Sequence, residues 1–293
     1  MGIGRSNLLA AVALGMGLFL GAHAVTAQQA SAPLWSDQIA KIVASPDRSV
    51  ADRTNDLRRK PEQMLSFIAL RPGIVALDLS AGGGYTTELL ARAIGPTGAV
   101  YGQSPPRDAN RVAPPPAAPE GNSNPTAAPS PASTPPAGAP RSSAAALAER
   151  DKKLRSAGIL AAPITAVARP FEEPVPPELA MESIDLVTLM FNYHDLGHLG
   201  VDRKKMNAAV YRALKPGGLY VIADHAGRPG TGITESGTLH RIEEAFLRKE
   251  VEAAGFKLLQ EGDFLRNPGD PRDQNTPDPP QPKDEFVLKF VKR

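Results

Sequence analysis

Residues 75–85 read Val75-Ala76-Leu77-Asp78-Leu79-Ser80-Ala81-Gly82-Gly83-Gly84-Tyr85. The apolar start predicts a buried parallel strand over 74–79, with Asp78 near its end. The glycines predict a loop that opens directly into a helix over 86–94. Glycine accepts positive φ and lets a ligand approach the main chain closely. In an open α/β sheet such a loop, at the carboxyl end of a strand, is where ligands bind.

Strand and helix signals alternate on both sides of this stretch. Further strands are predicted over 99–102, 164–168, 184–191, 219–223, 256–259 and 285–291. Further helices are predicted over 59–70, 144–157, 204–214 and 238–254. The alternation predicts a doubly wound, mostly parallel α/β sheet with right-handed crossovers. The last two strands have no helix between them, so we expect a C-terminal antiparallel hairpin at the edge.

The N-terminus has the layout of an export signal over 1–27. Arg5 gives a weak positive start, residues 8–20 form an apolar run, and small residues offer cuts after Ala24 or Ala27. The run is short for a bilayer span. We therefore expect a periplasmic or secreted protein that is free of the membrane once the signal is cleaved, and an uncleaved membrane anchor is the alternative.

The rest of the chain predicts one interrupted domain. Residues 28–58 form an N-terminal extension, and the α/β domain comprises 59–104 and 144–293. Between its two parts lies 105–143, which holds twelve of the chain's 30 prolines among Ala, Ser, Asn and Gly. This composition offers little to bury and lacks backbone donors, so it predicts a disordered insert.

Composition excludes several classes of function. Lys and Arg number 33 against 31 Asp and Glu, too even a balance for non-specific nucleic-acid binding, so no nucleic-acid partner is predicted. The hydrophobic content of 42% is ordinary for a globular chain and rules out a polytopic membrane protein. With no cysteine, the chain has no disulfides, zinc-thiolate sites, iron–sulfur clusters or thiol nucleophile.

The glycine loop departs from the dinucleotide-binding pattern. That pattern needs a third glycine and, after the second strand, an acidic residue for the ribose. Here Thr87 stands at the third glycine position and Gln103 ends the second strand. The sequence therefore disfavours a nicotinamide-dependent dehydrogenase.

The chain instead resembles the class I S-adenosylmethionine-dependent methyltransferases over 59–293, apart from the insert. The resemblance rests on the Asp78–Gly84 loop, the turn Leu214-Lys215-Pro216-Gly217-Gly218 and the terminal strand pair. Within that superfamily it looks like exported bacterial proteins known as predicted methyltransferases. That likeness rests on Arg59-Lys60-Pro61-Glu62, Gly82-Gly83-Gly84-Tyr85 and Tyr193-His194-Asp195. It implies S-adenosylmethionine as cofactor, and we expect a small molecule as methyl acceptor.

The resemblance assigns cofactor roles to the glycine loop. Asp78 would face the methionine amino group, and Gly82 and Gly84 would let the adenosyl group lie against the backbone. Ser80 replaces the usual first glycine of the loop. This replacement puts the affinity for the cofactor in question more than the fold.

Three further residues complete the implied cofactor set. Gln103 stands where an acid normally holds the ribose hydroxyls, and it offers hydrogen bonds without the charge. Phe171 follows the third strand, where it would either stack on adenine or belong to the core. Asn192 follows the fourth strand, at the same sheet edge as the loop.

A second group of polar residues gathers at the ends of the fourth and fifth strands. Tyr193, His194 and Asp195 follow the fourth strand, and Asp224 and His225 follow the fifth. We expect these residues to converge where a methyl acceptor would lie, with Tyr193, His194, Asp195 and His225 as catalytic candidates. His194 is the predicted base, since histidine titrates near neutral pH. A histidine that only caps a strand end is the alternative.

Two alternatives of other classes stay open. Ser80 and Gln103 favour a non-catalytic module that binds a ligand on a methyltransferase fold. His194, Asp195, Asp224 and His225 could instead bind a divalent cation, as in a metal-dependent hydrolase, although no metal is assigned to the predicted site. Gly197 argues against a rigid helix through this region. The basic run at 58–60 is interpreted as solvated.

Overall fold

The computed structural model describes residues 1–2, 32–106, 142–275 and 283–293. The predicted signal peptide at 1–27, apart from its first two residues, and most of the predicted insert at 105–143 lie outside the described residues. The chain divides by its contacts into Met1–Ala30 and Ser31–Arg293, and the second unit is the one described below. Among the helices described, none has the length and apolar content needed to cross a bilayer.

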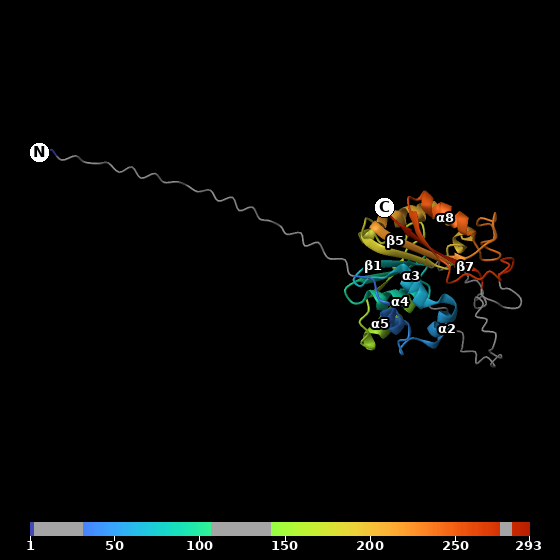
Figure 1. Ribbon diagram of the computed structural model, residues 1–293, viewed down its shortest axis with the longest axis horizontal. Helices are drawn as coiled ribbons and strands as arrows, with labels where there is room; N and C mark the ends of the chain where they lie inside the picture. Colours follow the sequence, from blue (N-terminus) through green and yellow to red (C-terminus); the bar gives the residue numbers. More distant parts are fainter. Residues whose placement is uncertain (3–31, 107–141, 276–282) are drawn as a thin grey trace. The chain divides into compact units, whose positions relative to one another are not determined.

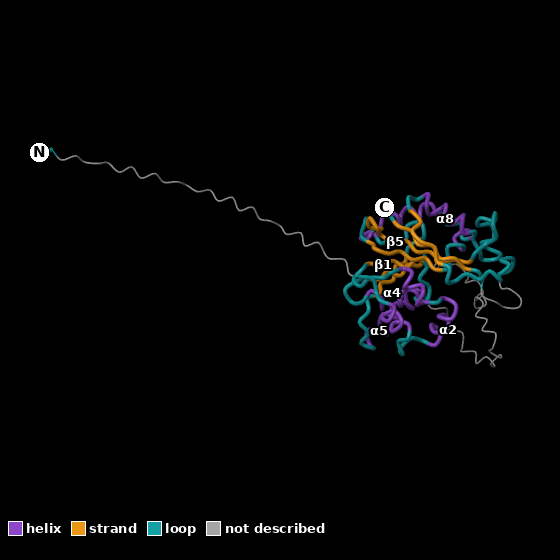
Figure 2. The backbone as a smooth tube through the Cα atoms, in the orientation of Figure 1, coloured by secondary structure: helices purple, strands orange, loops and turns teal. Residues whose placement is uncertain are grey.

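A seven-stranded sheet forms the centre of the described unit (Figure 2). Its strands are β1 (Val75–Leu79), β2 (Ala99–Ser104), β3 (Ile164–Ala168), β4 (Ile184–Met190), β5 (Leu214–His225), β6 (Lys257–Gly262) and β7 (Glu285–Val291). The order is β3-β2-β1-β4-β5-β7-β6. Strands β1 to β5 pair in parallel, and β7 runs antiparallel to both β5 and β6. The predicted doubly wound sheet with a C-terminal antiparallel pair is confirmed.

Helices cover both faces of this sheet (Figure 1). They are α1 (Ser36–Val43), α2 (Val50–Arg59), α3 (Pro61–Ile68), α4 (Tyr85–Ile94), α5 (Ser143–Ser156), α6 (Asp195–His198), α7 (Arg203–Ala213) and α8 (Glu244–Ala253), with a short 3-10 turn at Pro177–Leu179. One apolar cluster joins α1, α3, α4 and α5 to the sheet, and a second joins α7 and α8 to the opposite face. Strand residues alternate between the two: Ala76 belongs to the first cluster, and Leu77 and Leu79 to the second.

Several element boundaries differ from the predictions. Strand β5 begins at Leu214, because the predicted turn before it pairs with β4 through a register shift at 184–186. Helix α8 begins at Glu244 rather than at 238. The preceding residues 232–239 form turns, and Ile242 makes an isolated bridge to Ala226. A single helical turn, α6, includes Gly197 where no helix was expected.

The predicted N-terminal extension contains two helices that the sequence analysis did not find. In α1, Ile39 and Val43 are buried in the first apolar cluster. Helix α2 is polar along most of its length and begins at a capping residue, Ser49, whose hydroxyl accepts from the backbone N–H of Asp52. The Ser-x-x-Asp spacing is a helix-start signal that could have revealed α2.

Replacing a buried leucine of β7 tests the core. Leu288 is fully buried and pairs with Ile222 of β5. We expect Leu288→Ala to lower the free energy of unfolding by about 2–5 kcal/mol, because the cavity it leaves cannot fully collapse. The measurement is denaturant unfolding of both proteins. Leu160→Ala is the matched control, because Leu160 is 77% exposed, and a shift as large as that of Leu288→Ala would contradict the assignment of the core.

Candidate cofactor pocket and histidine cluster

The glycine loop lies at the point where the strand order reverses. Strands β1 and β4 are neighbours in the sheet. The chain continues from β1 to β2 on one side of this pair and from β4 to β5 on the other side. A pocket of about 320 Å³ opens over the loop. It is lined by Ala51, Asp52, Asn55, Arg59, Asp78, Leu79, Ser80, Ala81, Gly82, Gly83, Tyr85, Thr86, Arg150 and Met190. Open α/β sheets bind ligands at such a switch point.

The loop turns through a series of left-handed residues. Ser80, Gly82 and Gly84 have φ values of 56°, 53° and 80°. At Gly84 a Cβ would come within 2.7 Å of Leu147 in α5, so only glycine allows the helix to pack this closely. The backbone at Gly82 therefore forms part of the pocket wall, and no side chain covers it.

The carboxylate of Asp78 is buried at the bottom of this site. Its two oxygens accept hydrogen bonds from Thr87 Oγ1 in α4 at 2.6 Å and from Thr188 Oγ1 in β4 at 2.7 Å. Burial raises the pKa of Asp78 to about 6, against the opposing effect of these two hydrogen bonds. Asp78 lines the pocket.

Four of the predicted cofactor residues do not line the pocket: Gly84, Gln103, Phe171 and Asn192. The side chain of Gln103 is fully buried: its Oε1 accepts from the Ser80 N–H at 3.1 Å, and its Nε2 donates to the Arg169 carbonyl at 2.6 Å. Phe171 is buried in the apolar cluster of the α7 and α8 face. Both side chains are therefore committed to the protein interior.

Asn192 instead links the loop to the histidine cluster. Its Oδ1 accepts from Ser80 Oγ at 2.6 Å, and its Nδ2 donates to Asp195 Oδ2 at 2.7 Å. Ser80, predicted as a departure from the glycine pattern, thus has a specific partner at the end of β4. The polar contacts run without a break from the pocket wall to Asp195.

Helix α2 supplies the pocket wall that the sequence analysis missed. Asp52, Asn55 and Arg59 all line the pocket from this helix. The guanidinium of Arg59 lies over the rings of Tyr85 and Phe191, at 5.3 and 4.7 Å from their centroids. The interpretation of 58–60 as a solvated run is therefore wrong, because these side chains are partly buried against the domain.

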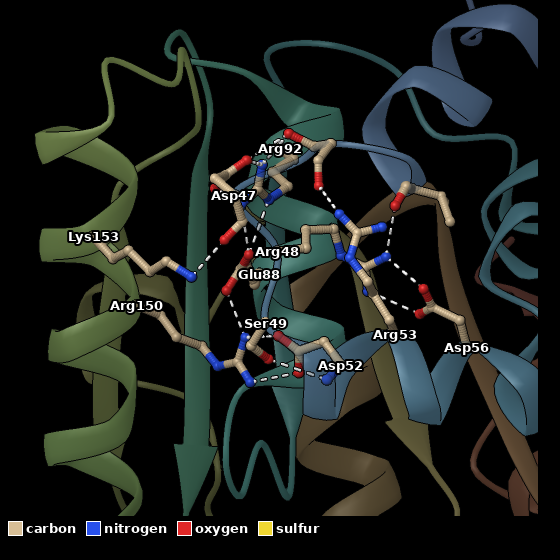
Figure 3. Close-up of polar contacts among 12 residues, drawn as sticks. Asp47, Arg48, Ser49, Asp52, Arg53, Asp56, Glu88, Arg92, Arg150 and Lys153 are labelled. Atoms are coloured by element: carbon tan, nitrogen blue, oxygen red, sulfur yellow. Dashed lines mark hydrogen bonds and ion pairs between the residues drawn. The ribbon is translucent and has the colours of Figure 1, made fainter.

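Ion pairs fasten α2 to the helices beside it (Figure 3). Arg150 of α5 pairs with Asp52 at 2.8 Å and with Glu88 of α4, and its Nε donates to the Gly83 carbonyl at 2.5 Å. Arg92 of α4 pairs with both Glu88 and Asp47. Burial opposes ionisation of Asp52, but its hydrogen bonds and ion pair with Arg150 outweigh burial and lower its pKa.

The histidines gather at the ends of β4 and β5, as the sequence predicts. His194 Nδ1 lies 2.6 Å from Asp224 Oδ1, and the His194 and His225 rings have centroids 5.2 Å apart. His225 Nδ1 lies 3.0 Å from a carboxylate oxygen of Glu285 in β7. Tyr193 points to the opposite face, where its hydroxyl contacts Glu250 of α8 and Asn207 of α7. The structure thus brings His194, Asp195, Asp224 and His225 together and separates Tyr193 from them.

The environment of His194 bears on its predicted role as a base. The ring is fully buried. Burial disfavours its charged form, but the nearby carboxylates of Asp224 and Asp195 outweigh burial and raise the pKa of His194 to about 10. Without another ligand, His194 is therefore an imidazolium at neutral pH, and a base must first lose that proton.

No protein-family model matches the chain, and no curated protein matches it either. Solved structures do. A SAM-dependent methyltransferase from Aquifex aeolicus aligns over 89% of this chain and 100% of its own, at 15% identity and a TM-score of 0.51.

Two further matches are more distant in fold. An arsenic(III) S-adenosylmethionine methyltransferase from Chlamydomonas reinhardtii aligns over 75% of this chain and 64% of its own, at 17% identity and TM-score 0.46. A TehB-like SAM-dependent methyltransferase from Corynebacterium glutamicum aligns over 88% and 98%, at 14% identity and TM-score 0.43.

The chain therefore has the fold of the class I S-adenosylmethionine-dependent methyltransferases. The finer likeness to exported bacterial predicted methyltransferases gains no support from these comparisons.

The raised pKa of Asp78 predicts a pH dependence of stability. The folded pKa is about 6 against an ordinary value of 3.8. The folded protein therefore retains a proton that the unfolded chain releases, and stability falls as the pH rises through this interval. Relative to Asp78→Asn, we expect the wild-type protein to lose about 3 kcal/mol of unfolding free energy between about pH 3 and 7.

Denaturant unfolding across that pH range measures the effect. Asp263→Asn is the control, because Asp263 is exposed on the loop after β6, and it is expected to follow the wild-type curve. If the free energies of unfolding of the wild-type protein and Asp78→Asn changed in parallel with pH, the pKa of Asp78 would not be raised in the folded protein.

Proposed function

We propose that this protein binds S-adenosylmethionine in the pocket over the glycine loop and transfers its methyl group to a small molecule. The observation that carries the proposal is the open main chain around Gly82, at the switch point of a methyltransferase fold. The pocket of about 320 Å³ lies within the range of about 300–1,000 Å³ that small-ligand sites occupy. The near-neutral charge of the chain also favours a small acceptor over a nucleic acid.

The cofactor would meet three kinds of group in this pocket. The carboxylate of Asp78 suits an ammonium group such as that of the methionine part. The left-handed loop at Gly82 offers backbone to the adenosyl group, and the side chains of α2 would cover the ligand from the other side. The sulfonium charge gains from the carboxylate of Asp78 in the wall.

Methyl transfer needs the acceptor atom in line with the sulfonium and, for a hydroxyl acceptor, a group that takes its proton. His194 remains the proposed group of this kind from the sequence, with Asp195 and His225 beside it. Its raised pKa weighs against that role at neutral pH.

A non-catalytic ligand-binding module is the second candidate. Gln103 favours it, because the side chain expected to hold the ribose is bound inside the protein to Ser80 and Arg169. The proposed location outside the cytoplasm, which rests on residues 1–27, points the same way, since S-adenosylmethionine is made inside the cell. The two candidates differ in whether a bound cofactor is ever consumed.

Blocking the loop tests cofactor binding. Gly82 has φ 53°, and a Cβ there would meet no atom closer than 3.8 Å, so Gly82→Val projects its side chain toward the pocket. We expect S-adenosylmethionine and its demethylated product to bind the wild-type protein, and Gly82→Val to bind them at least about tenfold more weakly. Isothermal titration calorimetry on both proteins measures this.

The matched control is Gly158→Val. Gly158 has a similar φ of 67°, is exposed and has open space around it, so this variant reproduces the backbone strain without touching the pocket. Equal binding by the wild-type protein and Gly82→Val, or no binding by the wild-type protein at millimolar cofactor, would overturn the cofactor assignment. Methyl-labelled cofactor incubated with a small-molecule extract then separates the enzyme, which yields labelled product, from the module, which does not.

A further inference from the structure

Three imidazoles surround one carboxylate oxygen at the carboxyl ends of β4 and β5. The Oδ1 atom of Asp195 lies 2.9 Å from His240 Nδ1, 3.1 Å from His194 Nε2 and 3.8 Å from His198 Nδ1. Asp195 and His198 belong to the short helix α6, whereas His240 comes from the segment before α8. One donor atom from each of His194, Asp195 and His240 lies within 4.8 Å of the other two.

The orientation of His194 is that of a metal-ligating histidine. Its Nδ1 atom faces the buried carboxylate of Asp224 at 2.6 Å, which also accepts from the backbone N–H groups of His194 and His225. Histidines that bind metals commonly donate their second ring nitrogen to a carboxylate, which fixes the tautomer and the direction of the ring. With Nδ1 as the donor, a metal ion that displaced the other imidazolium proton would bind Nε2.

The Nε2 atom of His194 has an independent feature that points to a ligand. It is buried and forms no well-aligned hydrogen bond with any described residue, although Asp195 Oδ1 lies 3.1 Å away. A buried polar atom without such a bond is costly unless something else binds it. The atom is aimed into the cluster, where an ion would satisfy it.

The remaining members of the cluster are held by their own contacts. Asn192 Nδ2 donates to the second oxygen of Asp195 and leaves Oδ1 facing the imidazoles. His240 adopts φ 51°, which is unusual for a residue with a Cβ, and this conformation directs its ring to Asp195. His194 is buried, but the side chains of His198 and His240 are 36% and 34% exposed, so the cluster is open to solvent on one side.

We propose that His194, Asp195 and His240 bind one divalent transition-metal ion of the zinc type, with His198 at the rim. Two imidazoles and one carboxylate form a donor set that suits Zn²⁺ and similar ions better than Mg²⁺ or Ca²⁺. Zinc–ligand bonds of about 2.0–2.1 Å place neighbouring donor atoms roughly 3.3 Å apart in a tetrahedron, close to the spacing around Asp195 Oδ1. Three protein ligands and a solvent-facing side leave a position for water or a small ligand.

This site differs from the metal alternative considered from the sequence. That alternative paired His194 and Asp195 with Asp224 and His225. In the structure the carboxylate of Asp224 accepts hydrogen bonds from three donors, and His225 Nδ1 lies 3.0 Å from a carboxylate oxygen of Glu285. His240, 45 residues from Asp195, takes their place as a ligand.

Metal binding by the purified protein tests the proposal without any cofactor or acceptor. The protein is treated with a chelator, dialysed against micromolar Zn²⁺ or against Mg²⁺, and the metal retained is measured by inductively coupled plasma mass spectrometry. We expect one Zn²⁺ per chain and no Mg²⁺. Asp195→Asn and His240→Asn should each weaken Zn²⁺ binding by at least about tenfold, the lower end of the loss caused by disturbing the groups that support a metal site.

His240→Asn is chosen because asparagine tolerates positive φ, so the variant removes the imidazole without new backbone strain. Asp263→Asn, with the same charge change at an exposed position, should bind Zn²⁺ as the wild-type protein does. Visible absorption of the Co²⁺-loaded protein provides a second readout, since its bands report on nitrogen and oxygen ligation.

A wild-type protein that retains no Zn²⁺ would overturn the proposal, as would Asp195→Asn and His240→Asn variants that bind it as tightly as Asp263→Asn does. A protein that binds Zn²⁺ but not S-adenosylmethionine would leave this site standing and reject the cofactor pocket. The experiments can therefore reject the metal site and the cofactor pocket independently of each other.

Discussion

The buried carboxylate of Asp78 is the constraint on which the site depends. It joins three elements, since it belongs to β1 and accepts hydrogen bonds from Thr87 in α4 and Thr188 in β4. These bonds fix the end of the strand relative to the start of the helix, so the chain between them has only residues 80–84 in which to reverse. The left-handed residues of the loop are the consequence, and they bring bare main chain to the pocket wall.

The sheet could be predicted because its strands are encoded locally. Apolar runs such as 184–190 have to be covered on both faces, and glycine and proline mark most of their ends. Helix α2 could not be found in this way. Its residues are mostly polar, and it is held by Arg150, which lies 98 residues away from Asp52 in the sequence. A helix that depends on such distant ion pairs leaves little trace in its own hydrophobic pattern.

The sequence predicted which polar side chains lie near the candidate site, but it did not predict which groups they would contact. The sequence placed polar side chains at the ends of β1, β4 and β5, and the structure shows them there. It could not indicate that Gln103 would bond to Ser80 rather than face a ligand, because both choices satisfy the same amide. His240 was overlooked as a member of the cluster, since the predicted helix over 238–254 included it, whereas in the structure it lies before α8, just after the turns at 232–239.

The ion pairs around α2 also determine how the pocket responds to acid. The hydrogen bonds of Arg92 lower the pKa of Asp47 to about 2, and Arg150 lowers that of Asp52 below its ordinary value. Since guanidinium groups stay charged throughout, these pairs are lost only as the pH falls toward 2 for Asp47, well below the range in which an unpaired aspartate is neutralised. The ion pairs that hold helix α2 over the pocket therefore persist in mild acid, whereas the Asp78 carboxylate, with a pKa of about 6, is protonated well before them.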